Sequence, residues 1–331
     1  MTRPLPAQII DSALEGSIVG SFSRIGPLVR SRLPGWEEIP RMDGLTAVIT
    51  GGTSGIGAAA ARKMALLGAK VIIIGRDRKR AEALRKKVRG AIDRDAIEIL
   101  IGDLSDLEET RRLAHEITSR HASIDVLVHN AGALLTERKA TQQGIEMTVA
   151  VHLLAPFLLT ELLLPLLRNA THPRVITVSS GGMYTQRFKL AELEMTPEAY
   201  NGTVAYARAK RAQIVLTEEW QRRHGGERIT FHAMHPGWVA TPGLDAGLPL
   251  FGRMMKPVLR TPAEGADTIV WLAAGGAGSA HGGRFWCDRK PRSPYYIPRT
   301  KPSTARALLE GTALYKWCRQ RISEGTGRQL Q

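Results

Sequence analysis

Short runs of apolar, mostly β-branched residues alternate along this chain with longer stretches in which apolar positions recur every three or four residues. The short runs are typical of buried strands and the longer stretches of helices. This alternation predicts an α/β fold in which helices cover both faces of a doubly wound parallel sheet. We expect strands at residues 45–50, 70–75, 96–101, 124–129, 173–179 and 228–235. We expect helices at residues 58–67, 78–89, 107–120, 142–168 and 204–223.

The two ends of the chain depart from this alternation. Residues 9–32 carry a weak amphipathic helical pattern that could lie on a membrane or pack on the body of the protein. Because its charged residues are few and balanced, we expect packing on the body, with peripheral membrane contact as the alternative. After residue 288 a basic, proline-rich stretch precedes a helical pattern from residue 304 to about residue 321. The predicted regions are an N-terminal helical appendage at 1–40, a central domain at 41–290 and a C-terminal extension at 291–331.

Composition narrows the class of protein. The 331 residues are 43% hydrophobic and 23% charged, which excludes a disordered chain. Two cysteines are too few for a disulfide framework or a thiolate metal site, so a reducing compartment is the simpler assumption. The first residues lack the pattern of a secretory signal. The most apolar segment, residues 151–167, contains His152, Glu161 and two prolines, which suits a helix buried in protein better than a membrane span. We expect a cytoplasmic protein.

The net charge of +15 is unevenly distributed. Residues 284–331 hold 11 Lys and Arg against 3 Asp and Glu, whereas residues 1–40 hold four of each kind. A basic tail can attract phosphates, anionic lipid or nucleic acid, but it also keeps a protein soluble. We favour the solvated surface and expect no nucleic-acid partner.

A glycine-rich turn joins the first expected strand to the first expected helix. It reads T-G-G-T-S-G-I-G from Thr50 to Gly57, and four alanines follow it. Glycines in such a turn let backbone N–H groups approach a pyrophosphate at the positive end of the helix dipole. This context predicts a dinucleotide site, whereas the glycine-rich run at 275–278 follows a helix and is typical of a loop.

Three side chains predict the reacting centre. Tyr206 and Lys210 are four residues apart and share one face of the helix expected at 204–223. An ammonium beside a phenol favours phenolate, and moving the pKa of tyrosine from ~10 to about 7 requires roughly 4 kcal/mol. Such a tyrosine can exchange a proton with a carbonyl or alcohol oxygen during hydride transfer. Ser180, after the fifth expected strand, would hold the same oxygen, with Ser179 as the alternative serine.

These motifs resemble the short-chain dehydrogenase/reductase family over roughly residues 43–287. The spacing T-G-x-x-x-G-x-G, the N-A-G after the fourth strand, Tyr-x-x-x-Lys and the H-P-G-W-V-A-T at 235–241 carry the resemblance. It implies a single Rossmann-type domain with strand order 3-2-1-4-5-6-7 that binds NAD(P) and acts as a dehydrogenase or reductase. It also implies contacts to the adenine from Asp103 and Leu104, to the carboxamide from Val239 and to the pyrophosphate from Thr241. The predicted nucleotide-binding residues are Thr50, Gly51, Thr53, Ser54, Gly55, Ile56, Gly57, Arg76, Asp103, Leu104, Asn130, Ala131, Gly132, Tyr206, Lys210, Pro236, Gly237, Val239 and Thr241.

One position departs from the family pattern. The family has an asparagine in the long helix after N-A-G, and its backbone carbonyl supports a water that relays protons from the lysine. Here the matching stretch is H-L-L-A-P-F-L-L-T, so His152 takes that place. A histidine keeps the carbonyl and can itself carry a proton. We therefore expect His152 to be either a member of a proton relay or a packed helix histidine.

The end of the second expected strand bears on the choice of cofactor. A site for NAD needs an acid there to hold the ribose hydroxyls, but Gly75 holds that place and Arg76 follows it. Arg76 can form charge-assisted hydrogen bonds to a 2′-phosphate, which predicts NADP, with NAD the less favoured cofactor. The alternatives are that Arg76 is a solvated charge and that Asp77 serves the ribose.

The segments after Ser180 and Thr241 predict an apolar wall that favours a small lipophilic carbonyl or alcohol. S-S-G-G-M-Y-T-Q and G-R-F-W-C-D-R-K-P-R resemble a narrower group, the family member 12-like dehydrogenase/reductases. The family resemblance also makes a homodimer plausible, and a regulatory or scaffold protein with little turnover is the alternative function. We expect no metal site, because His232 and His235 are three apart on a strand and face opposite sides. The residues expected to form the apolar wall of the substrate site are Met183, Tyr184, Leu244, Leu248, Phe251, Met254 and Met255.

Overall fold

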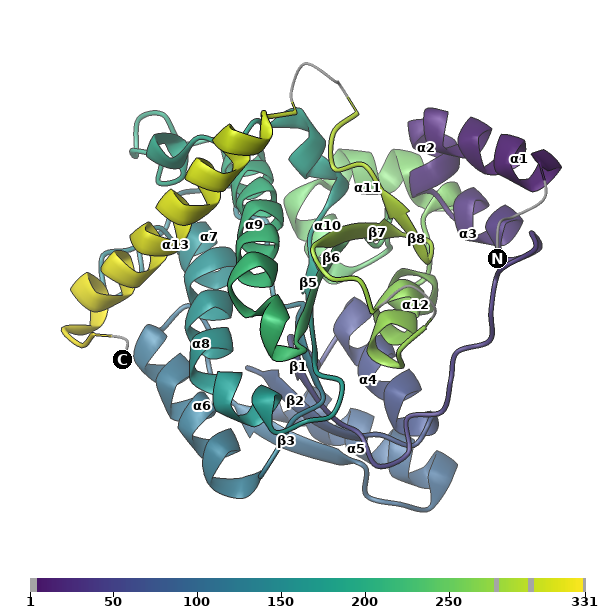
Figure 1. Cartoon of the computed structure of the whole chain (residues 1–331), viewed down its shortest axis with the longest axis horizontal. Coiled ribbons are helices and arrows are strands. Elements are labelled where there is room, and N and C mark those ends of the chain that lie inside the picture. The colour runs from purple at the N-terminus through teal and green to yellow at the C-terminus, as the bar shows by residue number, and fades with distance from the viewer. Residues whose placement is uncertain (1–4, 277–279, 297–300, 330–331) are drawn as a thin grey trace.

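A computed structural model describes residues 5–276, 280–296 and 301–329 (Figure 1). In this part of the chain the strands form one eight-stranded sheet of order β3-β2-β1-β4-β5-β6-β7-β8. Neighbouring strands are parallel except for β7 and β8, which form an antiparallel hairpin. The predicted α/β fold and strand order are confirmed, and β8 is an addition that the sequence pattern did not predict. The strands are β1 Thr46–Thr50, β2 Lys70–Gly75, β3 Ile97–Ile101, β4 Val126–His129, β5 Arg174–Val178, β6 Thr230–Met234, β7 Arg284–Cys287 and β8 Lys290–Arg292.

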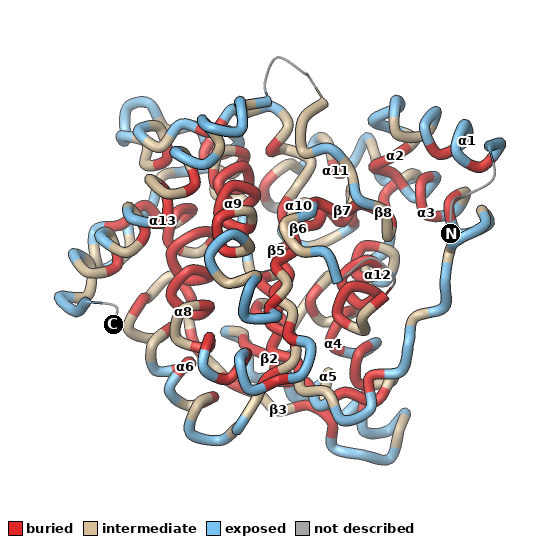
Figure 2. Tube along the Cα trace, viewed as in Figure 1, coloured by how far each residue is buried: buried red, intermediate tan, exposed pale blue. Residues whose placement is uncertain are grey.

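Helices cover both faces of the sheet (Figure 1). Ile72 and Ile74 of β2 enter one apolar core, whereas Val71 and Ile73 enter the other, because successive strand residues point to opposite faces. Burying both faces explains why the strands have continuous apolar sequences, and Figure 2 shows buried positions running along the strands and the inner sides of the helices. One face packs on α4 Gly55–Leu66, α5 Arg78–Ile92 and α12 Pro262–Ala273, and the other on α6 Leu107–Arg120, α8 Ala155–Arg168 and α9 Gly202–His224.

The long apolar helix expected at 142–168 begins later and changes its winding. It starts with α7 (Met147–Val149), passes through a π-helical turn at Ala150–Leu154 and continues as α8. Met147–Arg168 is long and apolar enough to cross a membrane, but 78% of its most apolar window is buried inside the protein. It is therefore a core helix.

Both ends of the chain pack onto this body. The single helix expected at 9–32 is divided into α1 (Leu5–Gly16), α2 (Ile18–Phe22) and α3 (Ile25–Arg30), which lie beside β8 and α11 (Pro249–Met255) in Figure 1. At the other end, α13 (Thr304–Thr326) packs along α9 and buries Leu314, Cys318 and Ile322 in the core. Its charges are partly paired with the body, for example Arg321 with Glu194 at 2.8 Å.

Candidate active site

The glycine-rich turn lies between β1 and α4, at the carboxyl end of the sheet. Gly51 and Gly55 have φ values of +66° and +52°, a region that side-chain-bearing residues rarely adopt. A Cβ on Gly57 would collide with the Gly51 carbonyl and the Asn130 amide, so packing as well as backbone conformation requires glycine. The turn thus has the close backbone approach that the sequence predicted.

The start of α4 differs from the other capped helices of the domain. Asp77, Asp106 and Thr261 cap α5, α6 and α12 with their side chains, whereas Ser54 makes no side-chain hydrogen bond at the start of α4. The first N–H groups of a helix carry partial positive charge and accept an anion when no side chain caps them. The residues present therefore fit a bound pyrophosphate.

The N-A-G segment is fastened directly to this turn. The Thr50 hydroxyl accepts hydrogen bonds from the backbone N–H groups of Asn130 and Ala131, at 3.0 and 3.1 Å. In return the Asn130 amide donates to the carbonyls of Thr50 and Gly51. These bonds join the ends of β1 and β4, and Gly132 continues the chain past His152, whose ring leaves no room for a Cβ there.

The turn after β6 reaches the same edge of the sheet. Gly237 has φ +80°, and a Cβ there would collide with the Arg260 side chain. Arg260 also donates to the carbonyl of Pro236 at 3.2 Å, and its backbone pairs with Val239. Thr241 caps α10 (Pro242–Gly247), and its methyl group lies 3.3 Å from the Cβ position of Gly55. The structure therefore brings the predicted Pro236–Thr241 turn against the glycine turn.

At the far end of the predicted nucleotide site, Arg76 follows β2. Its side chain is 74% exposed, and its guanidinium lies 3.7 Å from the carboxylate of Asp103. Asp77 turns away to cap α5 through the Arg80 N–H and to pair with the Arg80 side chain. Leu104 is buried in the core. Thr53 packs against Gly75, and Ile56, in the first turn of α4, packs on the core.

The predicted reacting groups meet beyond the end of β5. The Ser180 hydroxyl lies close enough to the Tyr206 phenol to act on its pKa, and it accepts a hydrogen bond from the Gly182 N–H at 3.3 Å. The hydroxyl of Ser179 instead donates to the Lys210 carbonyl, which leaves Ser180 as the serine at Tyr206. The Lys210 ammonium donates to the Val178 carbonyl at 2.8 Å and lies 5.5 Å from the centre of the Tyr206 ring.

The pKa values at this centre move in directions set by burial. Burial raises the pKa of Tyr206, and the Ser180 hydroxyl beside it offsets only part of that rise. Burial lowers the pKa of Lys210 to about 7, because removal from water disfavours the ammonium. In this structure the ammonium faces the Val178 carbonyl, so the lowering of the phenol pKa by Lys210 stays a prediction for the site with nucleotide bound.

His152 lies in the π-helical turn with its ring almost fully buried. Its Nε2 is 2.8 Å from the Ala133 carbonyl, and its ring meets that of Tyr206 edge-on with centres 5.2 Å apart. Burial and the Lys210 charge lower the pKa of His152 to about 3, so the ring is neutral. The His152 carbonyl, the predicted relay atom, accepts a hydrogen bond from Gln213 Nε2 at 2.7 Å.

The predicted substrate wall is only partly formed by the expected residues. Met183 is fully buried, and its contacts are with the core residues Ile214, Ala233 and Phe285. Met254 is 77% exposed and points to solvent. Tyr184 and Phe251 remain half-buried beside the site and meet aromatic partners, and Leu244, Leu248 and Met255 are also half-buried.

Three residues that sequence reasoning missed shape the site: Gln213, Arg260 and Phe22. Gln213 follows Lys210 by three positions on the same helix face, which is the one signal that could have indicated it. Arg260 holds the turn at Pro236, and Phe22 comes from α2, outside the predicted catalytic domain. The described residues contain no cluster of three or more His, Cys, Asp or Glu side chains suited to a metal.

Comparison with known proteins places this geometry in context. Residues 45–246 match the short chain dehydrogenase family. The human dehydrogenase/reductase SDR family member 12 is 38% identical over 82% of this chain and 86% of its own length. Human retinol dehydrogenase 14 is 33% identical over 86% of this chain and 90% of its own, and zebrafish polyprenol dehydrogenase 32% over 77% and 80%.

Solved structures agree with the fold. An uncharacterized protein from Mycobacterium paratuberculosis superposes with a TM-score of 0.65 at 29% identity, over 84% of this chain and 96% of that one. A Beutenbergia cavernae protein described as an NAD(P)-dependent gluconate 5-dehydrogenase, with bound NADP, has a TM-score of 0.61 at 25% identity. The superposition covers 75% of this chain and 96% of that protein.

Proposed function

Because this chain belongs to the short-chain dehydrogenase/reductase family of NAD(P)-binding oxidoreductases, we propose that it is an NADP-dependent reductase or dehydrogenase for a lipophilic carbonyl or alcohol. One observation carries the proposal. The hydroxyls of Ser180 and Tyr206 lie together beside Lys210, at the sheet edge where the uncapped glycine turn lies. A bound NADP(H) supplies or accepts the hydride.

The chain's own residues then move the proton. Ser180 and Tyr206 hold the substrate oxygen, and Tyr206 gives its proton to that oxygen in reduction or takes it in oxidation. A phenol whose pKa is raised keeps its proton near neutral pH, which suits the role of general acid. Lys210, with a pKa near 7 and its Nζ 5.5 Å from the centre of the Tyr206 ring, would return a proton to Tyr206. Val239 and Thr241, in the turn after β6, would hold the nucleotide together with the glycine turn that Thr241 touches.

The preference for NADP rests on Arg76. Its guanidinium is exposed at the end of β2, where charge-assisted hydrogen bonds to a 2′-phosphate can form. Asp77 is the acid that could have served NAD, but its side chain caps α5 and forms an ion pair with Arg80. Replacing Arg76 with alanine should weaken NADPH about tenfold or more and leave NADH nearly unchanged, measured as dissociation constants by calorimetry.

Arg78→Ala is the matched control for that experiment, because it removes one positive charge from the same helix start. If Arg76→Ala weakens both nucleotides equally, or the wild type prefers NADH, the assignment to NADP is wrong. If Arg78→Ala has the same effect as Arg76→Ala, the helix start acts as a diffuse positive charge.

A lipophilic substrate is supported by the half-buried apolar side chains after Thr241 and by relatives named for retinol and polyprenol. The cytoplasm is the proposed location, since Cys287 and Cys318 are free and buried. The deciding experiment follows NADPH and NADH consumption with retinoid, steroid, fatty and aromatic aldehydes and ketones. Turnover of at least one carbonyl is the expected result. Tight nucleotide binding without any turnover would favour the regulatory alternative.

A further inference from the structure

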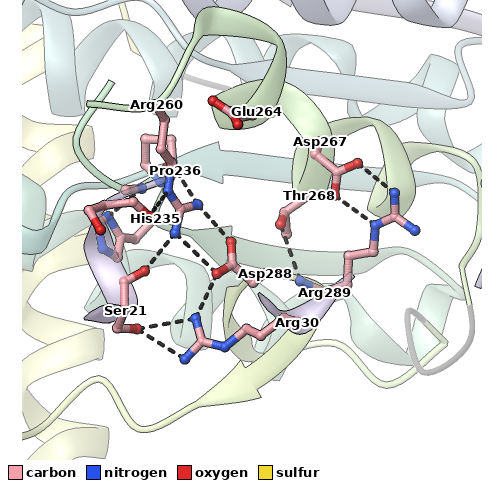
Figure 3. A network of polar contacts seen from close by, with 12 residues as sticks. Ser21, Arg30, His235, Pro236, Arg260, Glu264, Asp267, Thr268, Asp288 and Arg289 are labelled. Carbon is pink, nitrogen blue, oxygen red and sulfur yellow. Dashed lines mark hydrogen bonds and ion pairs between the residues drawn. The ribbon is translucent and has the colours of Figure 1, made fainter. Parts of the chain in front are cut away.

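The N-terminal helices are locked onto the body by buried charges. Arg30 is fully buried, and its guanidinium lies 2.9 Å from Asp11. The same guanidinium lies 2.6 Å from Asp288 (Figure 3). The opposite oxygen of Asp288 pairs with Arg260 at 2.6 Å, and Arg260 also donates to the carbonyl of Ser21 at 2.6 Å. We call these five residues the arm network and residues 5–32 the N-terminal arm. The network fixes where the arm lies relative to the turns after β6 and β7.

The arm places one aromatic ring beside the predicted reacting centre. Phe22 is 5% exposed, and a Cβ on Gly181 would lie 2.7 Å from its Cε2 atom. Its ring meets His235 with centres 4.2 Å apart, and its carbonyl accepts from the Trp238 N–H at 2.7 Å. Gly181 directly follows Ser180, and Trp238 directly precedes Val239. Phe22 therefore fills the space between the two segments that border the proposed substrate.

The Phe22 ring also belongs to a cluster of aromatic rings in contact with one another. Phe22 stacks with Tyr184 and meets Trp238 edge-on, with ring centres 6.1 and 5.8 Å apart. Trp238 in turn meets Phe251, with centres 5.2 Å apart. Tyr184 and Phe251 are the two aromatic residues of the predicted substrate wall. The arm thus supplies the middle of a wall whose ends come from the central domain.

We propose that Phe22 determines substrate size, so that the N-terminal arm, and not the family's α/β domain alone, completes the substrate site. This inference rests on the proposed carbonyl or alcohol chemistry. Glycine at 181 provides no bulk of its own, and the Phe22 ring occupies the space next to it, one residue after Ser180. A smaller side chain at position 22 enlarges the site, and a larger one reduces it.

The experiment compares acetophenone with 2-acetonaphthone, which is larger by one fused ring. Phe22→Ala should raise the ratio of kcat/KM for the naphthyl over the phenyl ketone about tenfold or more, and Phe22→Trp should lower it. Ile18→Ala, on the exposed side of the same helix, is the matched control and should leave the ratio unchanged. A purely structural role would lower both kcat/KM values together.

The same ratio is measured as dissociation constants for the two ketones by calorimetry with NADPH present. This second measurement needs no turnover, so it separates the two proposals. Absence of turnover with any carbonyl overturns the proposed function, whereas a binding ratio that responds to Phe22→Ala still supports the wall. Ratios unchanged in both Phe22 variants would overturn the role of Phe22 and leave the proposed function intact.

The opposite side of the arm carries a second, independent observation. Its large apolar side chains are exposed, including Leu5 at 70%, Ile9 at 61% and Ile18 at 54%. The carboxylates of the arm, Asp11 and Glu15, pair with Arg30 and Arg292, so they do not add negative charge to the outer side. The other exposed apolar residues of the arm are Ile10, Val19, Ile25 and Leu28.

The charges around this surface are positive. Arg24 and Arg32 are the exposed charged residues of the arm, and Arg253 and Lys256 are exposed on and after α11. The two parts touch, since the Arg24 N–H donates to the Val258 carbonyl at 2.9 Å. Aliphatic side chains on short surface helices with a basic border match the chemistry of an anionic lipid surface. We infer that the arm and α11 rest on such a bilayer, beside the wall that Phe22 completes.

Vesicle flotation tests this surface without any measurement of activity. The full chain should float with phosphatidylcholine vesicles that contain phosphatidylserine, and less in high salt. The triple variant Ile9→Gln, Ile18→Gln, Leu28→Gln should lose most of that binding. The control is Leu308→Gln, Leu309→Gln, which removes exposed leucines from α13 on the other side of the molecule. Equal binding by both variants would overturn the inference, as would a triple variant that instead loses dimers in sedimentation velocity.

Discussion

The proposed reacting centre and the arm network are both buried and polar, yet the pKa shifts favour the neutral form of the groups at the first and the charged form of Asp288 in the second. At the reacting centre burial prevails: it raises the pKa of Tyr206 and lowers those of Lys210 and His152, to about 7 and about 3. In the arm network burial alone would raise the pKa of Asp288, but Arg260 and Arg30 outweigh it and hold that pKa below its usual range.

The difference lies in the partners. Lys210 faces a neutral carbonyl, so nothing on the protein compensates the loss of water around its charge. Asp288 faces two guanidinium groups at 2.6 Å each, so its charge is compensated and held. Burial without a counter-charge makes a group ready to exchange protons, whereas burial with one makes it a fixed structural link. A reaction site and a fastening can therefore be built from similar residues.

The largest effect should come from removing the proton donor. Tyr206→Phe should reduce kcat by about 10²–10⁴ or more, the range for loss of a general acid, and should leave the nucleotide dissociation constant nearly unchanged. Tyr315→Phe is the control, because that hydroxyl is also hydrogen-bonded, to Glu161 at 2.7 Å, but lies on α13. Retained turnover in Tyr206→Phe would contradict the assigned mechanism. It would also contradict the view that burial prepares the reacting centre for proton exchange.

Next in size is the loss of the shared carboxylate. Asp288→Ala leaves Arg30 and Arg260 buried without their common partner and should lower the free energy of unfolding by about 3–5 kcal/mol. Urea titration followed by tryptophan fluorescence measures it. Asp43→Asn breaks the exposed pair with Arg41 and should cause no measurable change. Similar small changes in both variants would show that the network does not fasten the arm.

The same network predicts how stability depends on pH. The pKa values of Asp11 and Asp288 are depressed in the folded protein, and their ordinary value is 3.8. Their contribution is therefore fully present above pH 3.8 and is lost as the pH falls from there through the folded values. Urea midpoints between pH 7 and pH 3 should decline at the acid end, and Asp288→Asn should flatten that decline. An unchanged slope in the variant would assign the acid loss to other carboxylates.

The smallest effect is expected at His152. His152→Asn keeps the carbonyl that accepts from Gln213, and it removes a ring that is already neutral. The loss of kcat should be less than about tenfold, well below the about 10²–10⁴ expected for a general acid or base. The pH profile of kcat should keep its shape. A collapse to the level of Tyr206→Phe would show that the imidazole itself carries the proton.

Local patterns predicted the body of the protein because its chemistry is local. The glycine turn, the strand periodicity and the four-residue spacing of Tyr206 and Lys210 each lie within one short segment. The β7–β8 hairpin left no such signal. Its two-residue loop, Asp288-Arg289, has φ values of +49° and +56° and lacks the Asn-Gly sequence typical of that turn. Its strain is compensated by Arg30 and Arg260, which come from distant parts of the chain.

The sequence by itself determined the order of the strands and the chemical groups that the protein can use. Those groups are the nucleotide turn and the Ser180, Tyr206 and Lys210 side chains. The tertiary structure decided what state those groups adopt. It turned the Lys210 ammonium toward the Val178 carbonyl, made His152 neutral and brought Phe22 from the N-terminal arm to Gly181. A pKa and a contact depend on what lies nearby in space, and residue order specifies spatial neighbours only within a helix turn or a strand.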